Sequence, residues 1–226
     1  MSTTQINQNL IQINRWRFVN AFLVREDDGF TLVDTTVGGG ADELIQAARS
    51  GGGEIRRIAL THGHGDHVGS LDALKQKLGN TVQVLMPELD ARIHDGENVT
   101  GDKKPPGSWP KITTKPDVRL TGGERIGSLE VISTPGHTPG HVSFLDTRDR
   151  TVIVGDTLTS AGGLAVSNHF FWKFPFAAMA TWDKGKDVES AKKLRALDPA
   201  LLVVGHGGPV RAPAAELDKA IARAGG

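Results

Sequence analysis

The chain contains no cysteine and no tyrosine among its 226 residues. Without cysteine, the protein can form no disulfide, use no thiolate nucleophile and build no cysteine-based zinc site. Without tyrosine, no phenolic hydroxyl can assist a reaction. Any catalytic site must therefore be built from other side chains.

Neither positive nor negative charge is in excess, because 26 Lys and Arg residues balance 26 Asp and Glu residues. A nucleic-acid-binding protein usually carries a basic excess, so we expect a small-molecule substrate and no nucleic-acid partner. No apolar run approaches the roughly 20 residues that a membrane-spanning helix needs. Residues 1–14 are polar and lack the basic and apolar segments of a signal peptide. We therefore expect no membrane partner and a cytoplasmic location.

Length and composition favour a single domain over residues 1–226. Strand-like and helical segments alternate, and an Asp28-Gly29 pair between two apolar runs predicts a hairpin. This order predicts an α/β fold with a two-layer sheet core flanked by helices. The expected strands cover residues 16–25, 30–35, 55–60, 82–86, 128–133, 142–146, 151–154 and 201–204, and the expected helices cover residues 41–49, 70–78, 181–197 and 214–224.

Two segments admit more than one interpretation. Residues 92–120 are rich in glycine, proline and charge, so we expect a long irregular loop that is either a lid or an insertion. Residues 170–176 (FFWKFPF) are strongly apolar and aromatic. They fit the wall of an apolar pocket, ordinary core or a dimer contact, so a homodimer stays open.

Side chains that can bind metals follow the ends of several expected strands. His62, His64 and His67 come directly after residues 55–60. Ligand sites in open α/β sheets gather beyond the carboxyl ends of strands, and glycines beside these residues allow tight turns. We therefore expect one cluster formed by His62, His64, Asp66, His67, His137, Asp156 and His206.

The chemistry of this set indicates a catalytic metal site. Neutral imidazoles suit Zn²⁺, Fe²⁺ or Mn²⁺, and a carboxylate can bridge two ions. In an extended turn His62 and His64 lie on one side, whereas Asp66 and His67 point to a second position nearby. Two ions about 3.5–4 Å apart generate hydroxide at neutral pH and polarise a carbonyl or phosphoryl oxygen.

Several motifs resemble those of the metallo-β-lactamase superfamily, in its lactonase and glyoxalase II-like branch. Residues 61–67 (THGHGDH) resemble the H-x-H-x-D-H signature, and residues 134–141 (TPGHTPGH) resemble the third motif. The order and spacing agree over about residues 15–210. Less specific likenesses are residues 32–35 (LVDT), 154–158 (VGDTL) and 204–208 (VGHGG).

The resemblance implies an αββα sandwich, with two mixed β-sheets flanked by helices and the site at one edge. It also implies two divalent metal ions, for which zinc is the first candidate and iron, manganese or cobalt are alternatives. In this arrangement His62, His64 and His137 hold one ion, Asp66, His67 and His206 hold the second, and Asp156 bridges both.

Other residues have supporting roles by the same resemblance. Asp34 would orient a ligand histidine. His141 is expected to pack or hydrogen-bond near His137 without binding metal. His94 and His169 are expected to be loop histidines, and His169 is also considered as a pocket residue.

The resemblance implies a dinuclear metal-dependent hydrolase in which a metal-bridging hydroxide attacks a small carboxylic ester, lactone or thioester. Asp66 or Asp156 would be the catalytic residue that receives the proton. Asp156 argues against a true β-lactamase, which typically has cysteine or serine near that point. A phosphodiesterase-type hydrolase and an iron-dependent redox enzyme on the same scaffold are the alternatives.

Two differences from glyoxalase II enzymes and lactonases affect which branch of the superfamily the sequence resembles. Only about 20 residues follow His206, so we expect the helical region that binds glutathione in glyoxalase II enzymes to be absent. The tyrosine that helps several lactonases polarise the substrate carbonyl is also absent. The metals act alone in that task, His169 or Lys173 substitutes for the tyrosine, or the substrate is not a lactone.

Overall fold

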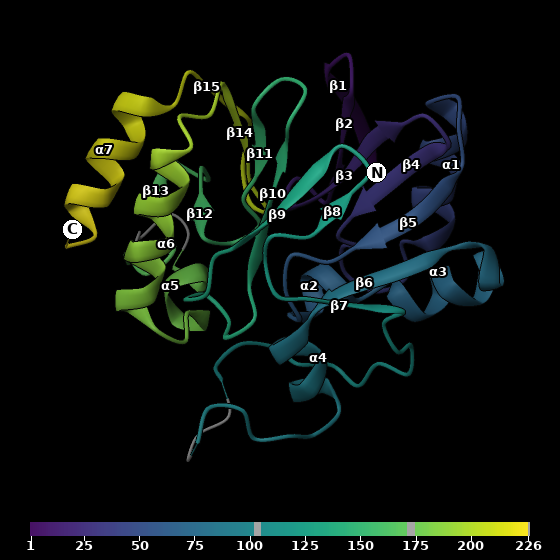
Figure 1. Ribbon diagram of the computed structural model, residues 1–226, viewed down its shortest axis with the longest axis horizontal. Helices are drawn as coiled ribbons and strands as arrows, with labels where there is room; N and C mark the ends of the chain where they lie inside the picture. The colour runs from purple at the N-terminus through teal and green to yellow at the C-terminus, as the bar shows by residue number, and fades with distance from the viewer. Residues whose placement is uncertain (102–104, 171–174, 226) are drawn as a thin grey trace.

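Two β-sheets stack face to face at the centre of the structure, and helices cover the outer face of each (Figure 1). The structure is a computed structural model that describes residues 1–101, 105–170 and 175–225. One sheet has seven strands in the order β1-β2-β3-β4-β5-β6-β7, and the other has six in the order β15-β14-β11-β10-β9-β8. This is the αββα sandwich with two mixed sheets that the sequence predicted.

The seven-stranded sheet is antiparallel from β1 to β4 and parallel from β4 to β7. Parallel neighbours need crossover connections, which α1 and α3 supply on the outer face. The elements are β1 (Ser2–Asn7), β2 (Leu10–Arg15), β3 (Val19–Glu26), β4 (Gly29–Val33), α1 (Ala41–Ser50), β5 (Ile55–Ala59), α2 (Gly65–Val68), α3 (Leu71–Leu78), the 3-10 helix η1 (Gly79–Thr81), β6 (Gln83–Pro87), α4 (Glu88–His94) and β7 (Val118–Leu120).

The six-stranded sheet is antiparallel apart from the parallel pair β11 and β14. Helices α6 and α7 cover its outer face (Figure 1). The elements are β8 (Arg125–Ile126), β9 (Leu129–Ser133), β10 (Val142–Asp146), β11 (Thr151–Ile153), the separate pair β12 (Leu158–Thr159) and β13 (Ala165–Val166), α5 (Phe176–Ala180), α6 (Lys184–Ala196), β14 (Leu201–Val203), β15 (Val210–Arg211) and α7 (Ala214–Arg223).

The central strands are apolar on both faces because both faces are buried. In β3, Ala21 and Leu23 pack toward α1 and α3, whereas Phe22 and Val24 pack against the other sheet. This alternation follows from the two-residue period of a strand. Double burial explains why β3 reads as a continuous apolar run in the sequence.

The structure corrects several boundaries. The segment of residues 1–14, described above only as polar, forms β1 and β2. The expected bounds of the irregular segment, residues 92–120, are wrong at both ends, because α4 extends to His94 and β7 begins at Val118. The helix expected at residues 181–197 begins only at Lys184, and a separate short helix, α5, precedes it.

The aromatic segment of residues 170–176 is only partly described, because residues 171–174 lie outside the described ranges. Phe170 and Phe176 are 63% and 61% exposed, so the core interpretation is wrong for these two side chains. Lys173, considered above as a donor, lies outside the described residues. Among the residues that the structure describes, no helix is long and apolar enough to cross a membrane.

Candidate metal centre

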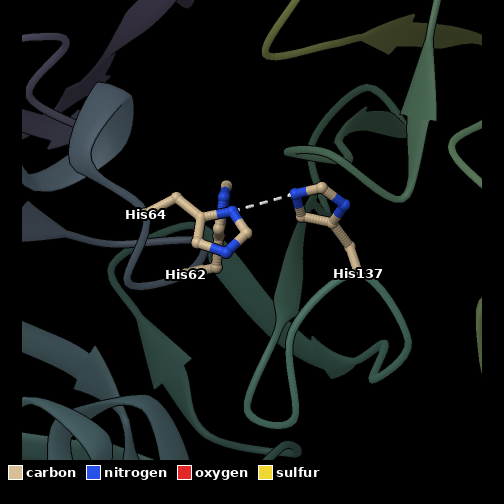
Figure 2. Close-up of side chains that lie close together, drawn as sticks. All are labelled: His62, His64 and His137. Carbon is tan, nitrogen blue, oxygen red and sulfur yellow. Dashed lines mark hydrogen bonds between the residues drawn. The ribbon is translucent and has the colours of Figure 1, made fainter. Parts of the chain in front are cut away.

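The structure brings all seven predicted site residues together in two adjoining groups. Within each group, the potential ligand atoms lie within 4.8 Å of one another. Figure 2 shows the first group, in which His64 and His137 approach from loops of different sheets. The first group is His62, His64 and His137, and the second is Asp66, His67, Asp156 and His206.

Asp156 connects the two groups, because its Oδ2 faces a histidine of each. Its Oδ2 lies 3.1 Å from Nε2 of His206 and 3.6 Å from Nε2 of His137. Its Oδ1 lies 3.4 Å from Nε2 of His67. A carboxylate that faces histidines of both groups has the geometry of a bridging ligand.

The backbone after β5 explains how one short segment serves both groups. His64 occupies the N-cap position of α2 with extended backbone angles, φ −70° and ψ 153°, so the chain is not yet helical at this residue. His62 and His64 therefore project toward the same group. The first turn of α2 then rotates Asp66 and His67 toward the other group, where Asp66 Oδ2 lies 3.1 Å from Nε2 of His206.

Several buried atoms at this position lack a hydrogen-bond partner within the described part of the chain. They are Nε2 of His62, Nε2 of His67 and Oδ1 of Asp156. Buried polar atoms in folded proteins are nearly always paired, and each unpaired one is costly. All three atoms point into the two groups, and imidazole nitrogens with carboxylate oxygens suit divalent ions. The donor set therefore fits metal.

Polar partners behind the rings fix which nitrogen faces the centre. The hydroxyl of Thr61 donates to Oδ2 of Asp34 at 2.8 Å, so it can only accept from Nδ1 of His62 at 3.0 Å. The hydroxyl of Thr181 donates to a backbone carbonyl and likewise accepts from Nδ1 of His137 at 3.1 Å. In both rings Nε2 is left as the unprotonated ligand atom.

Asp34 has the supporting position that the family resemblance implied. Its Oδ2 lies 2.8 Å from Nδ1 of His67, and its Oδ1 accepts from the backbone N–H of Thr61. The residue adopts a left-handed backbone at φ 61°, which turns the chain at the end of β4. Nδ1 of His206 is held in a similar way by the backbone carbonyl of Phe18, at 2.9 Å.

The charge state differs between the two groups. Burial lowers the pKa values of His62 and His137 well below the usual range, and it lowers that of His64 to about 4. These rings are neutral and ready to bind a cation. In the second group, burial opposes protonation, but Asp156 and Asp66 raise the pKa of His206 to about 10. In the metal-free protein, the second group therefore holds a proton on His206 where a metal cation would otherwise bind.

Asp90, beside the site, was not recognised from the sequence. Asp90 in α4 is buried and accepts from Gly63 N, Thr138 Oγ1 and Gly140 N, at 2.7–2.8 Å. It thus joins the two motif loops that supply the first group. Its place directly after β6, at the same sheet edge as the motifs, is the signal that could have identified it.

His94 corrects the expectation of a loop histidine, because it lies in the last turn of α4. Its Nε2 lies 2.8 Å from the carbonyl oxygen of Gly63, and its Nδ1 lies 3.1 Å from that of Pro110. It therefore connects residues 105–110 to the first motif.

The remaining two histidines lie outside the two groups. His141 is buried beside the centre, where its Nε2 accepts from the backbone N–H of Asp156 at 3.1 Å. That nitrogen is therefore occupied, as expected for a packing residue. His169 lies with Asn168 and Lys184 around a different hollow, so its expected alternative role as a pocket residue of this site is wrong.

A cavity of about 310 Å³ opens beside the two groups. Apolar side chains and side chains of both groups line it. Asp66 has 30% of its side chain exposed and can meet a substrate. The lining residues are Phe18, His64, Asp66, Ser108, His137, Asp156, Phe176, Ala177, Ala180 and His206.

The sandwich and the paired histidine–aspartate groups at its edge define a metal-dependent hydrolase. The profile of the Metallo-beta-lactamase superfamily matches residues 14–206, and the chain belongs to this family. The fold agrees: a metallo-beta-lactamase from Pontibacter korlensis superposes with a TM-score of 0.74 at 19% identity, over 99% of this chain and 98% of that one.

Relatives of known sequence are similar to different degrees. The uncharacterized protein YobT of Bacillus subtilis is 45% identical over 91% of this chain and 90% of its own length. A hydroxyacylglutathione hydrolase of Rhodopseudomonas palustris is 34% identical over 74% of this chain, but only 54% of the relative is covered. The structure of TTHA1623 in a di-iron-bound form has a TM-score of 0.67 at 27% identity, covering 87% of this chain and 91% of that one.

Proposed function

We propose that this hydrolase cleaves a small carboxylic ester, lactone or thioester at two divalent ions. The observation that carries the proposal is the position of Asp156, whose carboxylate faces histidines of both groups at 3.1–3.6 Å. His62, His64 and His137 would hold one ion, Asp66, His67 and His206 would hold the other, and Asp156 would contact both.

Two ions, when bound, would supply a nucleophilic hydroxide at neutral pH and polarise the carbonyl oxygen of the substrate. The side chains of the chain have separate tasks. Asp34, Thr61 and Thr181 each contact Nδ1 of an imidazole, which favours the tautomer whose Nε2 is unprotonated and can bind a metal ion. Asp66 is the more exposed of the two carboxylates that line the cavity, with 30% of its side chain exposed against 6% for Asp156.

Asp66 is the best placed group to receive a proton from the attacking water. Burial raises its pKa, but the charge of His67 and the hydrogen bond from His206 outweigh this effect and lower it well below the usual range. The carboxylate is therefore ionised at neutral pH. Asp156 is also ionised, because His206 and His67 outweigh the effect of burial on its pKa.

The metal and the kind of carbonyl substrate rest on weaker support. Zinc is our first candidate, and iron is supported by the di-iron-bound relative that is 27% identical. Thioester cleavage is supported by the hydroxyacylglutathione hydrolases, although the chain spans about half of their length. No Lys or Arg side chain lines the cavity among the described residues, which disfavours a phosphodiester.

The test combines metal analysis with a substrate panel. The protein is loaded separately with zinc and with iron, and both samples are assayed on p-nitrophenyl butyrate, a γ-lactone, an acyl-glutathione thioester and bis-p-nitrophenyl phosphate. We expect two ions per chain and faster turnover of a carbonyl substrate than of the phosphodiester. His206→Ala should lose an ion and activity, whereas His169→Ala, away from the site, should keep both. A loaded sample that cleaves only the phosphodiester, or consumes oxygen without hydrolysis, contradicts the proposal.

A further inference from the structure

We propose that the cavity beside the metal centre selects an uncharged, apolar acyl group, and that Phe18 and Phe176 form the surface that binds it. This inference rests on the proposed function and names the substrate class for it. The two rings meet edge to face, with centroids 6.5 Å apart and planes at 72°. Both line the same cavity as His64 and Asp66.

Both aromatic rings remain accessible although they are large and apolar. Phe18 is 43% exposed and Phe176 is 61% exposed. Exposed apolar surface that is continuous with a pocket of polar catalytic groups is typical of a ligand-binding wall. A substrate that covers these rings removes them from water, so apolar contact there increases affinity.

The same wall continues along α5 with small side chains. Ala177 and Ala180 line the cavity beside Phe176, so α5 leaves space where longer side chains would fill it. The cavity of about 310 Å³ lies at the low end of the range for small-molecule sites. The wall therefore suits a short or medium acyl chain, and binding should stop improving when the space is full.

Contacts with two histidines fix the apolar wall relative to the metal centre. The backbone carbonyl of Phe18 accepts from Nδ1 of His206 at 2.9 Å, and the Phe18 ring lies 5.2 Å from the His206 ring. At the other end of α5, Thr181 accepts from Nδ1 of His137 at 3.1 Å. Each group of the metal centre thus has one contact with the wall, which sets where an acyl chain lies when its carbonyl reaches the centre.

The charges around the cavity exclude an anionic tail. Among the described lining residues there is no Lys or Arg, and the carboxylates are those of Asp66 and Asp156. A carboxylate or phosphate at the far end of a substrate would meet no Lys or Arg among the described lining residues and would lose hydration beside apolar rings. We therefore expect discrimination against an acyl group that ends in a carboxylate.

The experiment uses the metal-loaded protein and p-nitrophenyl alkanoates from acetate to decanoate. We expect kcat/KM to rise by about fourfold for each methylene until the cavity is full, and then to level off. The hemisuccinate, which carries a terminal carboxylate, should react at least about tenfold more slowly than the butyrate. Flat rates along the series, or a preference for the hemisuccinate, would overturn the inference while leaving the proposed function in place.

Matched variants separate the wall from general effects on the protein. Phe176→Ala should reduce the gain per methylene and leave metal content unchanged, and Phe176→Leu should restore much of the gain. Met179→Ala is the control, because Met179 lies on the same helix, is 69% exposed and does not line the cavity. Equal loss in the Met179 and Phe176 variants would contradict a specific wall.

A binding measurement tests the wall even if no ester is cleaved. Calorimetry with 1-butanol, 1-hexanol and 1-octanol requires no reaction. We expect affinity to increase with chain length in the wild-type protein and the increase to be lost in Phe176→Ala. Failure of all carbonyl substrates with retained alcohol binding would overturn the proposed reaction alone. Length-independent alcohol binding would overturn the apolar wall alone.

Discussion

Nε2 of His64 lies 3.0 Å from the carbonyl oxygen of Pro106, and Nδ1 of the same ring lies 3.1 Å from Nε2 of His137. A carbonyl can only accept, so Nε2 of His64 carries the proton and Nδ1 is the nitrogen available to a metal. The nearby loop is attached further, since the backbone N–H of Gly65 donates to Ser108 O at 2.9 Å. This part of residues 92–120 therefore packs against the first motif and contacts a predicted ligand.

The first prediction concerns Gly107, which packs against the His64 ring. A Cβ atom at this position would overlap Nε2 of His64, so Gly107→Ala must displace the ring or the loop. We expect lower affinity for one of the two ions, by about tenfold or more. Metal titration of the metal-free protein measures this loss.

Gly101→Ala is the matched control for the Gly107 variant. Both glycines have a left-handed backbone, at φ 94° and φ 89°, but a Cβ atom at Gly101 would meet no atom of the described residues within 4 Å. Any general cost of alanine at a positive φ is therefore shared by the two variants. Equal metal affinity in the two would show that the Pro106 carbonyl does not position His64.

The second prediction tests the bridging position of Asp156. Among the described residues, Asp156 is the carboxylate that faces both groups, so we expect Asp156→Ala to lose at least one ion per chain by elemental analysis. Asp66→Ala should affect only the second group and leave the ion of the first group in place. Asp42→Ala, whose side chain is 81% exposed on α1, is the control. Two ions per chain in Asp156→Ala would contradict the assignment.

The clustering of the seven candidate ligands could be predicted because each lies in a short motif that follows a strand. Local sequence determines such turns, and the two sheets then bring them to one edge. By contrast, β2 was not recognised because its apolar alternation is interrupted by Gln12, which is buried. Its side chain donates to Oδ1 of Asn20 at 2.7 Å, and Asn20 in turn binds backbone carbonyls of the loop after β14.

The contacts that support the candidate ligands could not be predicted from the sequence either. Asp90 resembles an ordinary acidic residue in the first turn of a helix, which favours negative charge there. Its role depends on backbone N–H groups of two distant loops. The contact of Pro106 with His64 involves a backbone carbonyl in an irregular segment, and no residue type encodes where that carbonyl points.

The third prediction concerns Asp90 as the link between the two motif loops. Burial raises its pKa to about 6, although three hydrogen bonds favour the ionised form. In Asp90→Asn an amide NH₂ group would face the N–H of Gly140 or Gly63, so one buried donor loses its acceptor. We expect a loss of about 1–3 kcal/mol in unfolding free energy.

Denaturant unfolding of the metal-free Asp90→Asn protein measures the cost without involving the reaction. Glu88→Gln in the same helix is the control, since the half-buried Glu88 side chain is paired with Arg119 within the described residues, and a partly exposed ion pair of this kind contributes little. A stability equal to that of wild type would mean that Asp90 does not hold the two loops together.

The fourth prediction is that metal binding releases at least one proton per chain near pH 8. Burial alone would lower the pKa of His206, but Asp156 and Asp66 raise it from 6.5 to about 10 in the metal-free protein. His206 is therefore protonated at pH 8 and must become neutral to bind an ion. Affinity should increase with pH until the pH passes 10. Calorimetry in two buffers with different ionisation enthalpies counts the released protons.

The same pKa shift determines how His206 affects the stability of the metal-free fold. A pKa raised on folding contributes stability that is fully present below pH 6.5 and is lost as the pH rises through 10. The pKa of His67 is also raised, by Asp156 and Asp34 against burial, so its contribution has the same sign. The melting temperature of the metal-free protein should thus fall between pH 7 and pH 10, whereas that of the metal-loaded protein should fall less. Metal binding without proton release, together with a metal-free melting temperature that does not fall over this range, would show that cations do not replace protons in the second group.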